Sequence, residues 1–420
     1  MLKTSKISKI AIVMENFDYG GATTHLINLL CSKEFKKMKF ILFTNKNNSA
    51  VQNIINNCGS KNIKIVYFNS LNAIKTNNFF VKLIFFLLRP ILFALSVFQM
   101  YFIIKKYHFN IFLADCGGYG DFRTEMSGIL ASKMLKLNPT YLLIHHSYTK
   151  PRFWKFIINI FDYFIGKIVS NIFFVSNATK KSVEKNTWLT KSFKNESMVI
   201  HNGVWLKKIK NQKLKKIFNV RSNVIKVGML ARLEKYKGQI DLVEGFNNLP
   251  QNLKDRYKVF FIGSGTQKEL NNLRFKITEY NLKKYFKILK YIKGDSLSVI
   301  KNLDLLVSLT RDFEGFGYSI AESLYVGTPI LSTNVGGVKE FLNDKNSKLI
   351  KPMDISAISK SLKDFAYRRK AWNKRAYEGK KLIIKKFNSE IMSRKFLKEF
   401  LSLCLFFYKS EAHLSLLFNK

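Results

Sequence analysis

Residues 305–326 read LLVSLTRDFEGFGYSIAESLYV, and this stretch sets the expected architecture. Leu305–Ser308 is a short apolar run of the kind that forms a buried strand. A polar, glycine-containing loop follows, and then Tyr318–Val326, whose apolar residues recur at helical spacing. Strand, Gly-rich loop and helix in this order form one repeat of a parallel α/β sheet, in which the loops at the carboxyl edge bind ligands.

The same alternation of strands and helices runs through the rest of the chain. Strands are predicted at Ile10–Met14, Phe40–Thr44, Ile63–Phe68, Ile111–Ala114, Tyr141–Ile144, Ile172–Val175 and Met198–Ile200 in the first half, and at Ile225–Met229, Lys258–Ile262, Phe286–Leu289, Leu305–Ser308, Pro329–Ser332 and Lys348–Ile350 in the second. Helices are predicted at Thr24–Ser32, Arg123–Leu137, Ala178–Lys185, Gln239–Asn247, Thr266–Tyr280, Tyr318–Val326 and Ile355–Phe387. Such alternation indicates parallel sheets covered by helices on both faces.

The chain divides into two such series. It has 420 residues, which suits two domains of roughly 200 residues each. The second series restarts with a strand after the Lys-rich, polar stretch Val204–Ser222. We therefore predict an α/β protein with two Rossmann-like, doubly wound domains, at residues 1–205 and 206–387, that face a cleft. A cleft between domains is the usual place for a binding site.

Composition limits the partners. There are 71 Lys and Arg residues against 28 Asp and Glu, a net charge of +43. This excess favours an anionic partner, although enrichment in Lys, Asn, Ile and Phe, as in AT-rich coding sequence, accounts for part of it. The basic residues are spread along the whole chain and form no Arg-rich arm, so no nucleic-acid partner is expected.

The cysteines and the N-terminus indicate a cytoplasmic protein. Cys31, Cys58, Cys116 and Cys404 lie far apart, without the spacing of a disulfide framework or a zinc site. The apolar run at Ile10–Met14 is too short for the core of a signal peptide. We expect a location in the reducing cytosol.

Phe79–Ile104 departs from the soluble pattern, because it is apolar and long enough to span a bilayer. A spanning helix would separate the first three strands from the rest of their sheet. We favour a helix that presents an apolar and basic face to an anionic membrane surface, which would make the protein peripheral on the cytoplasmic face. An ordinary buried helix is the alternative.

Glycines and cations follow several strands. Gly20 and Gly21 lie between the first strand and the first helix, where free helix N–H groups receive phosphate. A tight turn is an equal alternative for this pair. Arg232 and Lys237 follow the first strand of the second series, where two cations can clamp a diphosphate.

Two glutamates and a histidine complete the candidate site. Glu314 lies in the loop after a strand, Phe316 and Gly317 lead into the next helix, and Glu322 lies on that helix among apolar residues. Carboxylates accept paired hydrogen bonds from vicinal hydroxyls of a sugar. The alternative is that both glutamates are solvated on a helix surface, which is the more common situation for two glutamates at this spacing. His145 ends a strand of the first domain, where an imidazole can act on a sugar.

Together these residues resemble the retaining GT-B glycosyltransferases, whose signature is a pair of glutamates separated by seven residues. Further similarity lies in Gly20-Gly21-Ala-Thr-Thr-His25, Phe174-Val-Ser-Asn-Ala-Thr179, His201-Asn-Gly-Val204 and Gly336-Gly-Val-Lys-Glu340. The resemblance implies transfer of a sugar from a nucleotide-diphosphate sugar to a glycan or lipid-linked acceptor, as in the synthesis of bacterial capsule, O-antigen or lipopolysaccharide. It also implies that residues 388–420 form a last helix that crosses back to the first domain.

The resemblance assigns a role to each candidate. Glu314 and the backbone of Phe316 and Gly317 would hold the donor sugar, and Glu322 would bind the ribose. Arg232 and Lys237 would stabilise the leaving diphosphate with help from Gly20 and Gly21, and His145 would contact the transferred sugar. The chain contains no Asp-x-Asp motif, which agrees with stabilisation by cations alone. We therefore expect a metal-independent enzyme without a cofactor.

Two other functions remain possible on the sequence. One is a basic adaptor that binds membrane or nucleic acid through a degenerate GT-B site. The other is a GT-B epimerase or phosphorylase, although no motif for a lysine-linked pyridoxal group is visible. The intact Arg232, Lys237 and glutamate pair favour the transferase.

Overall fold

The computed structural model describes residues 7–17, 19–72, 78–120, 122–137, 139–149, 155–193, 197–209, 214, 217–290 and 296–418, with side chains up to residue 403. These residues form two compact units. Met1–Gly203 and Ser389–Lys420 make up the N-terminal unit, and Val204–Asn388 makes up the C-terminal unit. The sequence predicts boundaries after residues 205 and 387, whereas the units change after Gly203 and Asn388.

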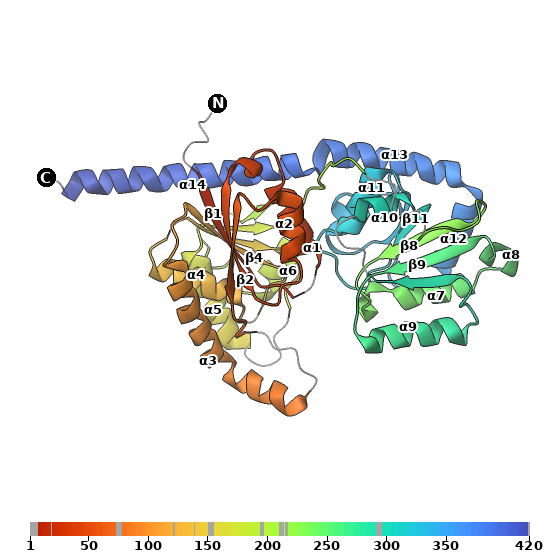
Figure 1. The fold of residues 1–420 in the computed structure, drawn as a ribbon, viewed down its shortest axis with the longest axis horizontal. Helices are drawn as coiled ribbons and strands as arrows, with labels where there is room; N and C mark the ends of the chain where they lie inside the picture. Colours follow the sequence, from red (N-terminus) through yellow and green to blue (C-terminus); the bar gives the residue numbers. More distant parts are fainter. Residues whose placement is uncertain are drawn as a thin grey trace. The chain divides into compact units, whose positions relative to one another are not determined.

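The N-terminal unit is built on a seven-stranded parallel sheet of order β3-β2-β1-β4-β5-β6-β7 (Figure 1). Its strands are β1 (Lys9–Met14), β2 (Lys39–Asn45), β3 (Ile63–Phe68), β4 (Ile111–Cys116), β5 (Thr140–Ile144), β6 (Asn171–Phe174) and β7 (Met198–Val199). Its helices are α1 (Gly21–Leu30), η2 (Phe35–Lys37), α2 (Val51–Cys58), α3 (Phe79–Ile104), α4 (Thr124–Met134), α5 (Lys155–Ile168), α6 (Asn177–Asn186) and α14 (Ser389–Phe418). Every residue of β4 and β5 is buried, as helices on both faces of a sheet require.

The C-terminal unit repeats this design with a six-stranded parallel sheet of order β10-β9-β8-β11-β12-β13. Its strands are β8 (Ile225–Leu230), β9 (Tyr257–Ile262), β10 (Phe286–Leu289), β11 (Leu305–Ser308), β12 (Ile330–Thr333) and β13 (Lys348–Ile350). Its helices are η3 (Lys235–Lys237), α7 (Gln239–Asn247), α8 (Gln251–Lys254), α9 (Gln267–Glu279), α10 (Ser296–Lys301), α11 (Tyr318–Val326), η4 (Gly336–Glu340), α12 (Ile355–Tyr367) and α13 (Arg369–Lys386). The strand order changes direction between β8 and β11, where doubly wound sheets bind ligands.

These two sheets confirm the predicted α/β class with two doubly wound domains. One helix prediction is wrong, because Ile355–Phe387 is two helices that meet at Arg368. Trp372 is buried against Phe365, with ring centroids 5.2 Å apart, and its indole N–H donates to Asp364 at 2.8 Å. This packing turns the chain at a position that has neither Gly nor Pro, so the sequence carries no local signal for it.

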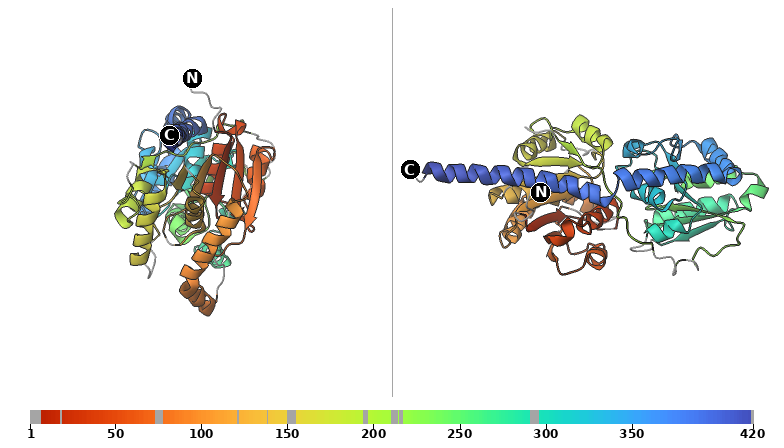
Figure 2. Two further views of the ribbon diagram at one scale, coloured as in Figure 1. Left: turned by 90° about the vertical axis from the view of Figure 1, so that its left-hand side faces the viewer. Right: turned by 90° about the horizontal axis from the view of Figure 1, so that it is seen from above.

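The last helix belongs to the N-terminal unit, although it follows the C-terminal unit in sequence. Figure 2 shows α14 running along that unit. Phe396 and Phe400 are fully buried, and their rings lie 5.2 and 6.2 Å from that of Phe173 on β6. Tyr141 on β5 packs against Phe400 at 4.8 Å. The aromatic residues of α14 therefore complete one face of the first sheet.

Candidate active site

Glu314 lies in the loop between β11 and α11, and a second loop holds its backbone. Gly337 donates its N–H to the carbonyl of Glu314 at 2.8 Å. Gly336 has φ +56°, and a Cβ there would lie 2.2 Å from the same carbonyl oxygen. Only a glycine fits this left-handed, crowded position. The Gly-Gly pair after β12 therefore serves to fix Glu314.

The side chain of Glu314 forms an ion pair with Lys237. The Nζ atom of Lys237 lies 2.7 Å from Oε2 of Glu314, and the hydroxyl of Thr310 donates to the same oxygen at 3.3 Å. Both side chains are largely buried, with 13% of Lys237 and 18% of Glu314 exposed. Burial lowers the pKa of Lys237, but the charge of Glu314 outweighs it, so the net pKa lies above the ordinary value. Lys237 is thus a fixed cation.

Lys237 is positioned by the segment around it. Gly238 follows in a left-handed conformation, with φ +79°, and a Cβ there would lie 2.3 Å from the carbonyl oxygen of Leu309. Arg311 pairs with Asp241 on α7, with one contact of 3.0 Å from Nε to Oδ2, and its backbone N–H donates to the carbonyl of Tyr236 at 2.7 Å. The loop that carries Glu314 is thereby fastened to the segment that carries Lys237.

Arg232 lies at the end of β8 and is half exposed. Its guanidinium pairs with Glu234 at 2.9 Å and donates to the hydroxyl of Tyr236 at 3.3 Å. The turn after β9 supports this segment closely, because a Cβ on Gly263 would lie 1.9 Å from the carbonyl oxygen of Ala231. The Gly263-Ser-Gly265 turn thus packs against the loop of Arg232.

Glu322 is buried in α11, and it is not a solvated surface glutamate. Only 7% of the residue is exposed. Burial raises the pKa of its carboxyl to about 7, although a hydrogen bond with Ser296 and the charge of Lys207 act in the opposite direction. A protonated carboxyl donates one hydrogen bond, whereas the ionised form accepts from two hydroxyls.

Phe316 and Gly317 offer only backbone atoms to a ligand. The ring of Phe316 is buried in the core, 5.0 Å from that of Phe341 and 5.3 Å from that of Tyr318. Gly317 caps α11 with φ +84°. The backbone role that the family resemblance implies for them stays a prediction.

In the N-terminal unit, His145 follows β5 and lies within a buried cluster. Its Nε2 lies 2.6 Å from Oδ1 of Asp115, which is on β4. Because a carboxylate accepts, Nε2 carries the proton and Nδ1 of a neutral ring is an acceptor. The ring of His25 lies edge-on at 4.7 Å, and its Nδ1 is 2.8 Å from Oδ1 of Asn202. Within the described ranges, Nδ1 of His145 and Nε2 of His25 have no hydrogen-bond partner.

Burial and the neighbouring His145 lower the pKa of His25 to about 3. The charge of Asp115 and the hydrogen bond with Asn202 raise this pKa, but their effects are weaker. His25 is therefore neutral at physiological pH. In the sequence, His25 and Asn202 stand out only as members of motifs that resemble the family, without a role of their own. Asp115 is not among the predicted residues, although an acidic residue at the carboxyl end of a buried strand is a usable signal.

Gly20 precedes α1, as the sequence predicts. Gly20 has an extended backbone, and a Cβ there would meet nothing within 4 Å. As the N-cap residue, Gly20 offers no side-chain cap to α1, and the first turn, which begins at Gly21, contains no acidic residue. Gly20 is therefore not required by the packing of the unit itself, which leaves room for a ligand beside the helix N-terminus.

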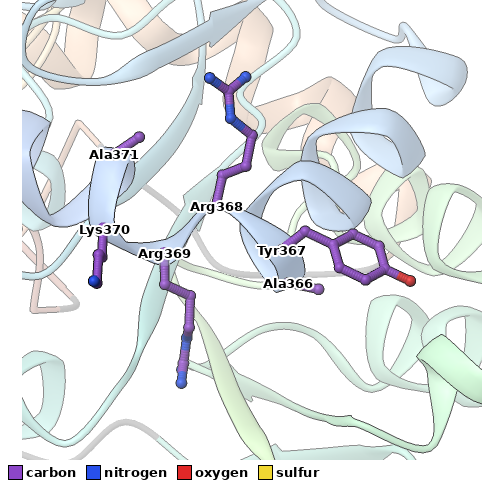
Figure 3. A pocket seen from close by; sticks show the side chains of 6 residues that line it. All are labelled: Ala366, Tyr367, Arg368, Arg369, Lys370 and Ala371. Carbon is purple, nitrogen blue, oxygen red and sulfur yellow. The ribbon is translucent and has the colours of Figure 1, made fainter.

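A surface hollow at the junction of α12 and α13 is lined by Ala366–Ala371 (Figure 3). Its side chains point in different directions, with Arg368 opposite to Arg369 and Lys370. Arg369 is paired with Asp304 at 3.1 Å, and Arg368 with Asp364 at 3.5 Å. No residue of the sequence motifs lines this hollow, so it is not assigned as the active site.

Comparison with known proteins finds a family similarity in the second half of the chain. Residues 210–382 match the model of the family described as Glycosyl transferases group 1. This part of the chain is therefore similar to the group 1 glycosyl transferases. The matched residues include Arg232, Lys237, Glu314 and Glu322.

Relatives and solved structures agree with this family. An uncharacterized glycosyltransferase of Methanocaldococcus jannaschii is 20% identical over 61% of this chain and 65% of its own length. The O-antigen biosynthesis glycosyltransferase WclY of Escherichia coli is 28% identical over 37% of this chain and 42% of its own. The matches thus span less than two thirds of either relative. The structure of Anabaena HepE in complex with UDP and glucose superposes with a TM-score of 0.74 at 17% identity, over 94% of this chain and 100% of that one, which identifies a GT-B fold.

Proposed function

We propose that this protein is a group 1 glycosyl transferase that moves a sugar from a nucleoside-diphosphate sugar to a glycan or lipid-linked acceptor, with retention at the anomeric carbon. The observation that carries the proposal is the buried pair of Lys237 and Glu314, held between two glycine-dependent loops. A cation fixed in this way is organised before the substrate arrives. It can therefore stabilise charge that develops on a leaving diphosphate.

The other site residues of the C-terminal unit bind different parts of the donor. The ammonium of Lys237 has three donor hydrogens, so it can keep its contact with Glu314 and still reach a phosphate oxygen. Arg232, half exposed on the adjacent loop, supplies a planar fork for the same diphosphate. Glu314 and the backbone N–H groups of Phe316 and Gly317 hold the sugar, and Glu322 holds the ribose.

The N-terminal unit contributes the first helix and the histidine cluster. N–H groups at Gly20 and Gly21 assist the diphosphate. His145, which is hydrogen-bonded to Asp115, contacts the transferred sugar. We further propose that these groups act without a metal ion or a cofactor.

The likeness to an O-antigen biosynthesis glycosyltransferase supports a bacterial capsule, O-antigen or lipopolysaccharide pathway as the setting. WclY is named for O-antigen biosynthesis, and HepE was solved with UDP and glucose. We take uridine diphosphate sugars as the first donors to test. The alternative, an adaptor with a degenerate site, is disfavoured because the cations and both glutamates are present and ordered by the fold.

The test is a panel of nucleotide sugars, assayed for hydrolysis and for thermal stabilisation of the full chain. We expect one nucleoside diphosphate to stabilise the protein, whereas an adaptor shows no such preference. Lys237→Ala, Arg232→Ala and Glu322→Ala each remove a proposed donor contact. Loss of a preorganised charge in an active site lowers kcat by about 100- to 1000-fold.

The matched control is Lys235→Ala, two residues before Lys237 in the same 3-10 helix and exposed. It removes the same charge and should leave the rate unchanged. Normal turnover by all three site variants would overturn the assignment of the site.

A further inference from the structure

The first half of α3 extends from the N-terminal unit without being covered by it (Figures 1 and 2). No residue from Phe79 to Ile91 is buried. Phe80, Ile84 and Leu87, one or two turns apart on the same side, are between 57% and 72% exposed. Only 11% of the most apolar window of α3 is buried within the structure.

The second half of α3 is apolar on both faces. One stripe packs into the unit through Phe93, Val97 and Met100. The opposite stripe, with Leu95 and Phe98, is more than half exposed. A helix that is apolar all round is normally buried, so a second apolar medium is needed for this face.

Helix α5 contacts α3 and exposes apolar side chains of its own. The rings of Phe93 on α3 and Phe161 on α5 are in contact, with centroids 5.1 Å apart. The outward face of α5 exposes Phe156, Ile160 and Phe164 at helical spacing. An exposed apolar surface of this extent marks an interaction site.

The charges around this surface have one sign. Among the described residues, α3, α4 and α5 expose no acidic side chain, because Glu125 and Asp162 are both buried. The exposed charged residues there include Lys82, Lys155 and Lys167. Lysines beside an apolar face suit the headgroups and acyl boundary of an anionic bilayer.

The topology shows how α3 can meet a bilayer. β3 precedes α3 and β4 follows it, and both strands lie in the same sheet. A helix that crossed a membrane would place these two strands on opposite sides of it, so the sheet is incompatible with a spanning α3.

We propose that α3 and α5 together dock the protein on an anionic membrane surface, with the first half of α3 inserted into the acyl boundary. This goes beyond the sugar transfer and does not depend on it. The probe is the full chain with vesicles of phosphatidylcholine, with and without phosphatidylglycerol. Binding should require the anionic lipid and weaken, without vanishing, as salt is raised.

The deciding variant is Phe80→Ser/Ile84→Ser/Leu87→Ser. These side chains make no buried contact, so the melting temperature should not change. Each substitution removes a large apolar side chain that would otherwise move from water into the bilayer. We therefore expect the triple variant to bind vesicles at least about 100-fold more weakly than the wild type. The matched controls are single variants, Phe80→Ser against Phe275→Ser, since Phe275 on α9 of the C-terminal unit is 70% exposed. Only the first should weaken binding.

Two results would overturn the proposal. One is equal vesicle binding by wild type and triple variant. The other is a wild-type chain that ignores vesicles but forms a dimer that the triple variant loses, which would make a second copy the occupant of this surface. Donor binding is measured separately on the same proteins, so failure of the proposed transfer is distinguishable from failure of docking.

Discussion

Lys237 and Glu314 are assigned by the sequence to different parts of the donor, yet in the structure they are partners of one another. Lys237→Met leaves the carboxylate of Glu314 largely buried without its cation. We expect this to lower the free energy of unfolding by about 2 kcal/mol, less than for a fully buried pair because both groups retain some solvent. Adding Glu314→Gln should recover part of the loss, as measured by urea unfolding of the single and double variants. Lys235→Met, on the exposed side of the same turn, should leave the free energy of unfolding unchanged. Equal losses of stability in Lys237→Met and Lys235→Met would contradict a stabilising ion pair between Lys237 and Glu314.

Glu322 should make stability depend on pH. Its carboxyl has a pKa of about 7 in the folded chain, against 4.5 ordinarily, because burial disfavours the charge. Between these values the folded chain holds a proton that the unfolded chain has lost, so the free energy of unfolding falls as pH rises. The shift corresponds to about 3 kcal/mol in total.

Glu322→Gln removes this titration. We expect the variant to equal wild type near pH 4 and to exceed it in stability above pH 7, in urea unfolding at a series of pH values. Glu125 and Asp162 also have raised pKa values of about 7, but they titrate in both proteins and cancel in the difference. A constant difference across the range would exclude a protonated Glu322.

Single residues show where sequence reasoning ends. The spacing of Glu314 and Glu322 and the place of Arg232 and Lys237 after a strand are local features, so they can be found along the chain. The contact of Lys237 with Glu314 joins positions 77 residues apart, and that of His25 with Asn202 joins positions 177 apart. Such partners depend on how the strands assemble, which local patterns do not specify.

Among the elements, the turn after β12 makes the sharpest prediction. Gly336→Ala places a methyl group against the carbonyl oxygen of Glu314 at a left-handed backbone. We expect the left-handed conformation to lower the free energy of unfolding by about 1 kcal/mol and the steric overlap to lower it by about 2 kcal/mol more. Donor binding should also be lost, because the overlap displaces Glu314. Gly327→Ala is the control, since Gly327 has φ +80° but open space around its Cβ. It should cost only about 1 kcal/mol in chemical unfolding and leave donor binding intact. Equal losses in the two variants would show that the contact with Glu314 is unimportant.

Helices illustrate which signals sequence carries. The bounds of α3 and α11 follow directly from runs of apolar residues, and both are as predicted. The break between α12 and α13 is set by the packing of Trp372 on Phe365, which no spacing rule detects. The surroundings of α3 are equally hidden, because an apolar run predicts burial without saying whether protein or lipid provides it.

At the scale of the whole molecule, alternation of strands and helices is enough to predict two doubly wound sheets. Buried parallel strands have nearly continuous apolar sequences, as in β1 and β9, and these are easily located. The strand order follows from the preference of alternating strands and helices for a doubly wound parallel sheet. Local pattern alone does not show that a segment after residue 388 packs on strands more than 200 residues earlier, and only the family resemblance suggests it.

That long-range packing can be tested with Phe400. Its ring is buried against Tyr141 and Phe173, so Phe400→Ala opens a cavity in the N-terminal unit and should cost about 3 kcal/mol. Since 1.4 kcal/mol is a factor of ten, amide exchange of the most protected positions of β5 and β6 should accelerate on the order of 100-fold. Hydrogen exchange with mass spectrometry resolves these strands from those of the C-terminal unit, where β11 should keep its protection. Trp372→Ala is the reciprocal control. It should accelerate amide exchange in α12 and leave the exchange rates of β6 unchanged. If Phe400→Ala left β5 and β6 unchanged, α14 would not be part of the folded N-terminal unit, and the chain would need a different division from the one its contacts define.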